Sequence, residues 1–194
     1  VARASHVLGV RWALDQYQFT RYSAGKAGQL AQLYLPPEHE TIVREWYSAH
    51  SMVRDLVNTP PIDLGPAELA DFAKQLAEEY KGHYHTIYGL ELENECPAIH
   101  AVGMGSERAP RLIQLEWGSE DHPVLCLAGK GVVFDTGGLN LKSGDRMLNM
   151  KKDMGGSAHV LGLAQLIMAH QLPVRLKVFI AAVENMVSGR SYRP

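Results

Sequence analysis

One glycine-rich segment, residues 129–156, follows an apolar run of the chain and includes two lysines and two aspartates that could do chemistry together. They are Lys130, Asp135, Lys142 and Asp153. Carboxylates and amines gathered in turn-rich backbone suit metal-assisted hydrolysis, in which divalent cations activate water and polarise a carbonyl. Two aspartates supply too little anionic oxygen for two hard or borderline divalent ions. We therefore expect further metal ligands to come from elsewhere.

The two aspartates also have ordinary structural interpretations. Asp153 precedes Met-Gly-Gly and could be a helix N-cap, because a carboxylate there accepts backbone N–H bonds and opposes the helix dipole. Asp135 precedes Thr-Gly-Gly and could be a turn aspartate that bonds its own backbone. Lys130 is harder to explain, since a lysine after a buried strand must reach water or find a partner. A phosphate-binding loop is excluded because the spacing G-x-x-x-x-G-K-[ST] is absent around Lys130.

The nine histidines include only one close pair, His83 and His85. Their alternate spacing on a strand would put both side chains on the same face. Because no third ligand is visible in the sequence, we interpret both as surface residues.

Composition and charge narrow the class of protein. At 46% hydrophobic and 21% charged residues, the chain lies in the ordinary range of globular domains. The formal net charge of -2 gives no global basic field to hold nucleic acid or an anionic membrane. No apolar stretch approaches the roughly 20 residues needed to cross a bilayer. The sequence therefore predicts a soluble, cytoplasmic protein without membrane or nucleic-acid partners.

Hydrophobic periodicity predicts an α/β fold with a largely parallel or mixed sheet flanked by helices. Helical spacing marks residues 7–17, 38–57 and a stretch that begins at Pro66, and strand-like runs are found at 83–88, 111–117, 123–128 and 176–183. The run at 123–128 is apolar enough to be buried on both faces. A helix expected after Asp153 would connect it to the last strand in a crossover unit. Ligands of such sheets bind beyond the carboxyl ends of the strands, where residues 130–153 would emerge.

The two ends of the chain point to a longer protein. The sequence begins at Val1 and ends at Pro194, soon after an apolar strand-like run. A strand at that point needs further elements to pair with it and cover it. We therefore expect the sequence to be a fragment.

Taken together, the motifs resemble the signature of the M17 family, the cytosolic leucyl aminopeptidases. The stretches that carry the resemblance are GKGVVFDTGG at 129–138, Lys142, DMGG at 153–156, RDLVNTPP at 54–61 and ENMVSG at 184–189. The resemblance covers most of the chain, more loosely before Arg54 and between Tyr80 and Arg111. It implies that the fold is the start of the M17 catalytic domain.

The resemblance implies a role for each motif residue. Lys130, Asp135 and Asp153 would be metal ligands, with Lys130 acting through its neutral amine and Asp135 bridging two metals. Lys142 would be catalytic, because a protonated amine there could polarise the scissile carbonyl or stabilise the oxyanion. Met150 would form a wall of the pocket for the first side chain of the substrate, with a core-filling methionine as the alternative interpretation.

The same resemblance implies a two-metal aminopeptidase, with manganese or zinc, that releases N-terminal residues from peptide substrates and forms a homo-hexamer. A later family segment, Asn-Thr-Asp-Ala-Glu-Gly-Arg, would supply the remaining ligands and an arginine that binds a bicarbonate base. That segment does not occur before Pro194, so these 194 residues would hold half of the metal site and be inactive alone. Residues 1–47 would be the tail of an N-terminal domain with its linking helix, and residues 48–194 the first half of the catalytic domain. The alternative function is that of a catalytically silent family member that acts as a binding or assembly protein.

Overall fold

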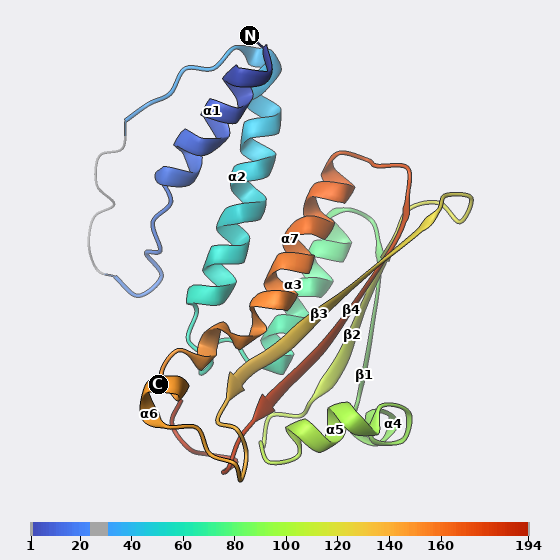
Figure 1. Cartoon of the computed structure of the whole chain (residues 1–194). Coiled ribbons are helices and arrows are strands. Elements are labelled where there is room, and N and C mark those ends of the chain that lie inside the picture. The colour runs from blue at the N-terminus through green and yellow to red at the C-terminus, as the bar shows by residue number, and fades with distance from the viewer. Residues whose placement is uncertain (1, 24–30, 194) are drawn as a thin grey trace.

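The computed structural model of the chain describes residues 2–23 and 31–193 (Figure 1). The helices are α1 (Ala2–Asp15), α2 (Pro37–Asn58), α3 (Pro66–Glu79), α4 (Gly89–Glu95), α5 (Pro97–Gly103), α6 (Gly144–Met147) and α7 (Gly155–Ala169), with a 3₁₀ helix, η1 (Met150–Met154). The strands are β1 (His83–Tyr88), β2 (Arg111–Trp117), β3 (Val124–Asp135) and β4 (Arg175–Asn185). Among the described residues, no helix is both long and apolar enough to pass through a membrane.

Local sequence explains where the longer helices begin. Pro37 and Pro66 each stand at the first helical position, where the fixed φ of proline suits the helix and its missing N–H costs nothing. At the start of α3, the backbone N–H of Gly65 donates to Glu68 Oε2 at 2.9 Å. The apolar stripe of α3, with Leu69 and Leu76, is buried in the core. These helices therefore begin and pack as their sequence predicts.

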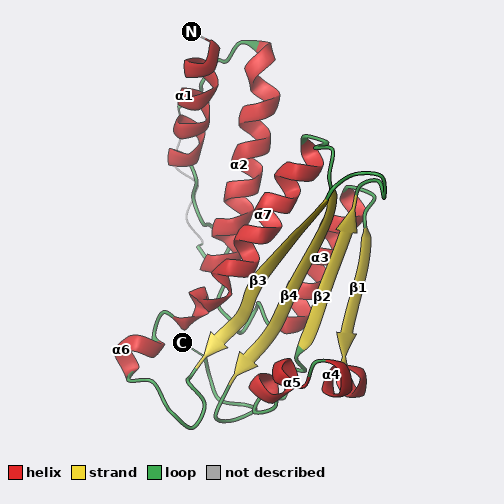
Figure 2. Cartoon of the chain, turned by 45° about the vertical axis from the view of Figure 1, so that its right-hand side comes forward, coloured by secondary structure: helices red, strands yellow, loops and turns green. Residues whose placement is uncertain are grey.

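The sheet is mixed, with the strand order β1-β2-β4-β3 (Figure 2). β1 pairs with β2, and β2 with β4, in antiparallel fashion, whereas β3 and β4 are parallel. The mixed form of the predicted sheet is thus confirmed, and a largely parallel sheet is wrong for this part of the chain. The predicted crossover is also confirmed, because α6, η1 and α7 connect the two parallel strands.

Helices cover one face of this sheet. α7 packs against β3 and β4, α3 packs against β1 and β2, and α2 packs on the outside of α7 (Figures 1 and 2). The core between them is aliphatic and includes Leu115, Leu161 and Ile180. α4 and α5 lie at the end of the sheet to which β3 and β4 point (Figure 2).

The other face of β3 is exposed in the structure. Val124 is 61% exposed, and Cys126 and Ala128 are exposed as well. The prediction that residues 123–128 are buried on both faces is therefore wrong for the described residues. The reason is that β3 is an edge strand of this sheet, and among the described elements only those on the helical face pack over it.

Candidate metal centre

The glycine-rich segment leaves the sheet at the carboxyl ends of the two parallel strands. Asp135 is the last residue of β3, Asn185 is the last residue of β4, and the two are partners in the strand register. A pocket of about 750 Å³ opens at this point. It is lined by Asp135, Gly137, Asn140, Leu141, Lys142, Ser143, Arg146 and Asn185. This is the position at which open α/β sheets bind ligands.

A β-bulge in β3 brings two of the motif residues to the same face of the sheet. Lys130 lies opposite Ala181 and Asp135 lies opposite Asn185, with a register shift between Val132 and Phe134. In a regular strand, residues five apart point to opposite faces. The bulge adds one residue to β3, so Lys130 and Asp135 point to the same face. Bulges often re-aim a side chain next to a functional site.

The loop after β3 folds back so that Lys142 meets Asp135. Lys142 Nζ donates to Asp135 Oδ2 at 2.6 Å, and the backbone N–H of Lys142 donates to the carbonyl oxygen of Thr136 at 2.9 Å. The turn needs glycine at two positions, because Gly137 and Gly138 have φ of 89° and 64°. A Cβ on Gly137 would also lie 2.4 Å from the carbonyl oxygen of Asn140. The Thr-Gly-Gly sequence therefore fixes the contact between the two charged side chains.

Asp135 is held as a carboxylate by its donors. Besides Lys142, the backbone N–H of Gly137 and the side-chain amide of Asn185 both donate to Oδ1, at 2.9 and 2.8 Å. Burial alone would raise the pKa of Asp135, but these three hydrogen bonds outweigh it and leave the pKa below its ordinary value. The bond to Gly137 is also the turn contact that the ordinary interpretation of Asp135 predicts. Asp135 thus serves as a turn residue and presents a charged oxygen to the pocket.

Lys130 and Asp153 form the second contact. Lys130 Nζ lies 2.6 Å from Asp153 Oδ2, with side chains 59% and 20% exposed. Close packing of α7 on β3 brings them together: a Cβ on Gly156 would lie 3.0 Å from the backbone nitrogen of Lys130. Asp153 lies within η1 and is not the N-cap of α7, a position taken by Met154 without a side-chain hydrogen bond. The N-cap interpretation of Asp153 is therefore wrong.

Met150 is the first residue of η1, the same 3₁₀ helix that carries Asp153. Its side chain is half-buried. The neighbouring Lys151 donates from Nζ to the carbonyl oxygen of Asn58 at 3.1 Å, which ties η1 to the end of α2. The two predicted site residues on η1 are thus fixed to one anchored turn.

The donor set fits a cation at each aspartate but does not complete a metal site. Within residues 2–23 and 31–193, no three His, Cys, Asp or Glu side chains converge on a common point. Each aspartate instead forms an ion pair with one lysine ammonium at 2.6 Å, so each carboxylate already binds a cationic group. Hard divalent ions prefer such oxygens and need more of them than two aspartates provide. Lys130, Asp135 and Asp153 could therefore hold part of a metal centre.

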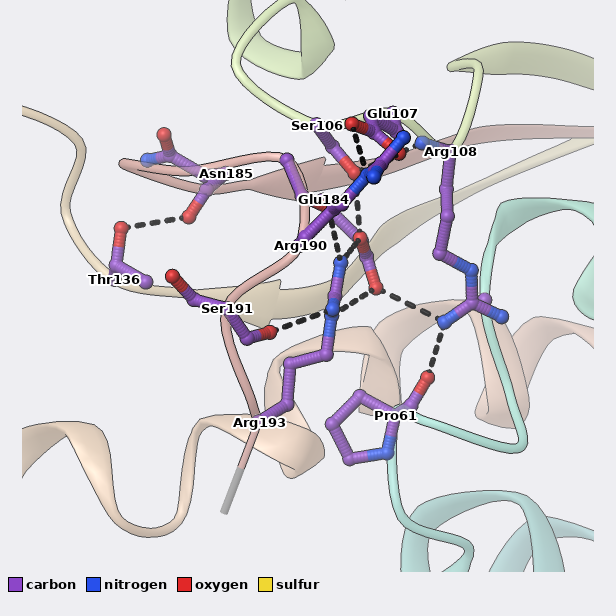
Figure 3. A network of polar contacts seen from close by, with 12 residues as sticks. Pro61, Ser106, Glu107, Arg108, Thr136, Glu184, Asn185, Arg190, Ser191 and Arg193 are labelled. Atoms are coloured by element: carbon purple, nitrogen blue, oxygen red, sulfur yellow. Dashed lines mark hydrogen bonds and ion pairs between the residues drawn. The ribbon is translucent and has the colours of Figure 1, made fainter.

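Sequence reasoning missed a buried polar network at the end of β4, next to the pocket-lining Asn185 (Figure 3). Glu184, at the end of β4, is 0% exposed. Its Oε1 accepts from Arg193 Nε at 3.0 Å and Arg108 Nη1 at 3.1 Å, and its Oε2 accepts from Arg193 Nη2 and Ser106 Oγ, each at 2.7 Å. Arg108 also donates to the carbonyl oxygen of Pro61, before α3. A glutamate inside an apolar strand was the available signal, because a buried charge requires partners.

The described histidine pair lies away from this pocket. His83 and His85 are both exposed on β1, on the same face, opposite Glu116 and Gln114 of β2. Their interpretation as surface residues is confirmed.

Comparison with known proteins links the geometry to one family. Residues 51–194 match the model of the cytosol aminopeptidase family, catalytic domain. Among curated relatives, a probable cytosol aminopeptidase of Roseiflexus castenholzii is 42% identical over 147 residues, 74% of this chain and 30% of the relative. Peptidase B of Yersinia pestis is 37% identical over 196 residues, 95% of this chain and 45% of the relative. The chain thus spans less than half the length of these relatives.

Solved structures show the same fold. The cytosol aminopeptidase of Coxiella burnetii superposes with a TM-score of 0.92 at 48% identity, covering 97% of this chain and 41% of that one. The bottromycin maturation enzyme BotP in complex with Mn gives a TM-score of 0.84 at 31% identity, covering 95% of this chain and 40% of that one. The predicted mixed sheet flanked by helices is therefore the architecture of these proteins.

Proposed function

Because this chain belongs to the cytosol aminopeptidase family, we propose that the protein of which it is part releases N-terminal residues from peptides in a metal-dependent reaction. The observation that supports this most directly is the geometry at the carboxyl ends of β3 and β4. There, Asp135 lines an open pocket and holds the Lys142 ammonium at 2.6 Å. The second pair, Lys130 of β3 and Asp153 of η1, is equally close. Carboxylates beside an open pocket could bind the cations with which such enzymes activate water and polarise a carbonyl.

In this proposal, Lys130, Asp135 and Asp153 would hold divalent ions, with Asp135 shared between two of them. When bound, two ions would supply an activated water and polarise the first peptide carbonyl. Lys130 would have to bind as the neutral amine. Its side chain lies against Asp153, so these two residues would hold an ion together, and the charge of that ion would favour the neutral amine. The remaining ligands would come from the part of the family's length that this chain does not span.

Lys142 would remain protonated and donate to the oxyanion. It lines the pocket while its Nζ is bonded to Asp135 Oδ2, so its charge is already held beside the space that a substrate would enter. Preorganised charge at a developing oxyanion is among the largest contributions to acyl-transfer catalysis. Met150, on η1, would form a wall of the pocket for the first side chain of the substrate.

Several features of the whole protein belong to the same proposal. Residues 1–47 would link an N-terminal domain to the catalytic domain, of which residues 48–194 would be the first half. The protein would be a cytoplasmic homo-hexamer, and a bicarbonate ion would assist as base. Manganese and zinc are both acceptable ions, because sites of this type are filled largely according to metal availability. The relative solved with Mn favours manganese as the first ion to test.

The test is hydrolysis of leucine p-nitroanilide and its N-acetylated form by the full-length protein. We expect turnover of the free-amine substrate only, loss of turnover after treatment with a chelator, and recovery on addition of Mn²⁺ or Zn²⁺. Equal turnover of the acetylated substrate would contradict an exopeptidase. A folded protein that is inactive with both metals would instead be the catalytically silent family member.

A further inference from the structure

The side chain of Asn185 contacts the carboxylate on which the proposed metal site depends. Its Nδ2 donates to Asp135 Oδ1 at 2.8 Å. The backbone N–H of Gly137 donates to the same oxygen at 2.9 Å, whereas Lys142 donates to Oδ2 at 2.6 Å. Two neutral donors on Oδ1 fix the plane of the carboxylate. Oδ2 then carries only the charged partner, and Asp135 lines the pocket, so Oδ2 is the oxygen best placed for a cation.

Asn185 is itself held firmly by its backbone. Its carbonyl oxygen accepts two hydrogen bonds from Thr136. One comes from the backbone N–H at 2.9 Å, and the other, drawn in Figure 3, comes from Oγ1 at 2.8 Å. Thr136 is buried and is the first residue of the loop that leads to Lys142. The backbone of Asn185 therefore fixes the start of the loop that carries Lys142, while its side chain fixes the Asp135 carboxylate.

The preceding residue anchors this end of β4 from the other face of the strand. Successive strand residues point to opposite faces, so Glu184 enters the buried network while Asn185 points to the pocket. The network joins Glu184 to Arg193, which follows β4, and to Ser106 and Arg108, which precede β2. Four hydrogen bonds to one buried carboxylate leave the strand end little freedom, which preorganises the Asn185 amide.

We propose that Asn185 is a positioning residue of the metal centre, which orients Asp135 by donating to Oδ1 and leaves Oδ2 for the cation. This role rests on the proposed function of Asp135 as a metal ligand. Partners that orient metal-binding carboxylates typically change metal affinity 10- to 100-fold when they are removed. Asn185 touches neither substrate nor the cation in this role.

The experiment measures Mn²⁺ binding to the chelator-stripped, full-length protein by isothermal titration calorimetry. The variants are Asn185→Leu, which keeps the size of the side chain but removes the donor, and Asn185→Ala, which serves if leucine disturbs folding. Both leave the backbone bonds to Thr136 in place. Asn94→Leu, on the exposed surface of α4, is the matched control. Asp135→Asn reports on the ligand itself, and urea unfolding of each metal-free variant reports on the fold.

We expect both Asn185 variants to weaken Mn²⁺ binding about 10- to 100-fold, with the metal-free unfolding midpoint close to that of the wild type. Binding as tight as in the wild type, while Asp135→Asn binds weakly, would overturn the role of Asn185 and leave the proposed function standing. A loss of binding that merely follows a lower unfolding midpoint would assign Asn185 to stability alone and also overturn it. Wild-type protein that takes up no Mn²⁺, or an Asp135→Asn variant that binds normally, would overturn the metal site and this role together.

Discussion

Replacement of Glu184 by glutamine is expected to destabilise the protein by about 3–5 kcal/mol, the usual cost of removing one partner of a buried ion pair. Glu184 is fully buried and Arg193 is only 5% exposed. The substitution therefore leaves the Arg193 guanidinium without the negative charge of residue 184 and with little access to water. The shape of the side chain is kept, so the loss reports on charge and hydrogen bonding and not on a cavity.

The individual contacts support the size of this effect. Each carboxylate oxygen accepts two hydrogen bonds, one of them from Arg193, at 3.0 and 2.7 Å. A glutamine offers one acceptor oxygen, and its NH₂ group must then face a guanidinium N–H. The hydroxyl of Ser106 can rotate and accept, but a guanidinium has no acceptor. With the NH₂ group on the Ser106 side, one hydrogen bond from Arg193 is lost; hydrogen bonds to charged groups contribute about 1.5–3 kcal/mol each. The buried guanidinium N–H left without an acceptor adds a further penalty of about 1–3 kcal/mol, which is consistent with the estimate.

The assay is urea unfolding of the metal-free, full-length protein, followed by tryptophan fluorescence. Glu93→Gln, on the exposed side of α4, is the control for the same chemical change at the surface, where ion pairs contribute about 0–1 kcal/mol. A loss of stability in Glu184→Gln no larger than in Glu93→Gln would refute the reasoning. It would mean that the network in Figure 3 does not hold the strand end.

Three further predictions follow from the same geometry. Lys142→Ala should lower kcat roughly 10²-fold or more, while the amount of bound metal, measured by elemental analysis, stays constant. Loss of the metal would instead show that Lys142 has a structural role. Gly129→Ala should destabilise the protein by about 1–3 kcal/mol, because its Cβ would lie 2.6 Å from a side chain of α7. Gly144→Ala is the control and should not destabilise the protein, because its Cβ would have no atom within 4 Å. Equal unfolding midpoints for the two variants would contradict this prediction. Burial alone would raise the pKa of Glu68, but backbone amides and the Arg108 guanidinium lower it below its ordinary value. The carboxylate of Glu68 therefore stabilises the fold at pH values above its pKa in the unfolded chain. This stabilisation is lost as the pH falls through its pKa in the folded protein. Urea midpoints measured from about pH 6 to about pH 3 should therefore fall less steeply for Glu68→Gln than for the wild type, and parallel curves would contradict this.

Local patterns predicted much of the fold because they act over a few residues. The runs at 83–88 and 111–117 coincide with β1 and β2, and the helix predicted from Pro66 is α3. α4 and α5 were not predicted, since helices of seven residues are too short to show a helical period. Strand order and direction depend on contacts between distant parts of the chain, which explains why the sequence predicted a largely parallel or mixed sheet without deciding between them.

In the candidate site, too, contacts between residues near in sequence could be predicted, and contacts between distant residues could not. The motif placed Asp135 and Lys142 only seven residues apart, and the structure brings their side chains together. The contact of Asp135 with Asn185 spans 50 residues, and the bulge that aims Asp135 depends on pairing with β4. Neither can be read from local spacing. The buried Glu184 could have been suspected from a charge in an apolar run, but its partners could not have been named.

The measurement that tests the central claim most directly is the metal content and activity of Asp135→Asn and Asp153→Asn in the full-length protein. After stripping and reconstitution with Mn²⁺, we expect both variants to retain less metal than the wild type and to hydrolyse leucine p-nitroanilide orders of magnitude more slowly, because a dication site loses a charged ligand in each. Asp145→Asn, an exposed aspartate on α6, should behave as the wild type. Near-normal metal content and turnover in both Asp135→Asn and Asp153→Asn would contradict the account.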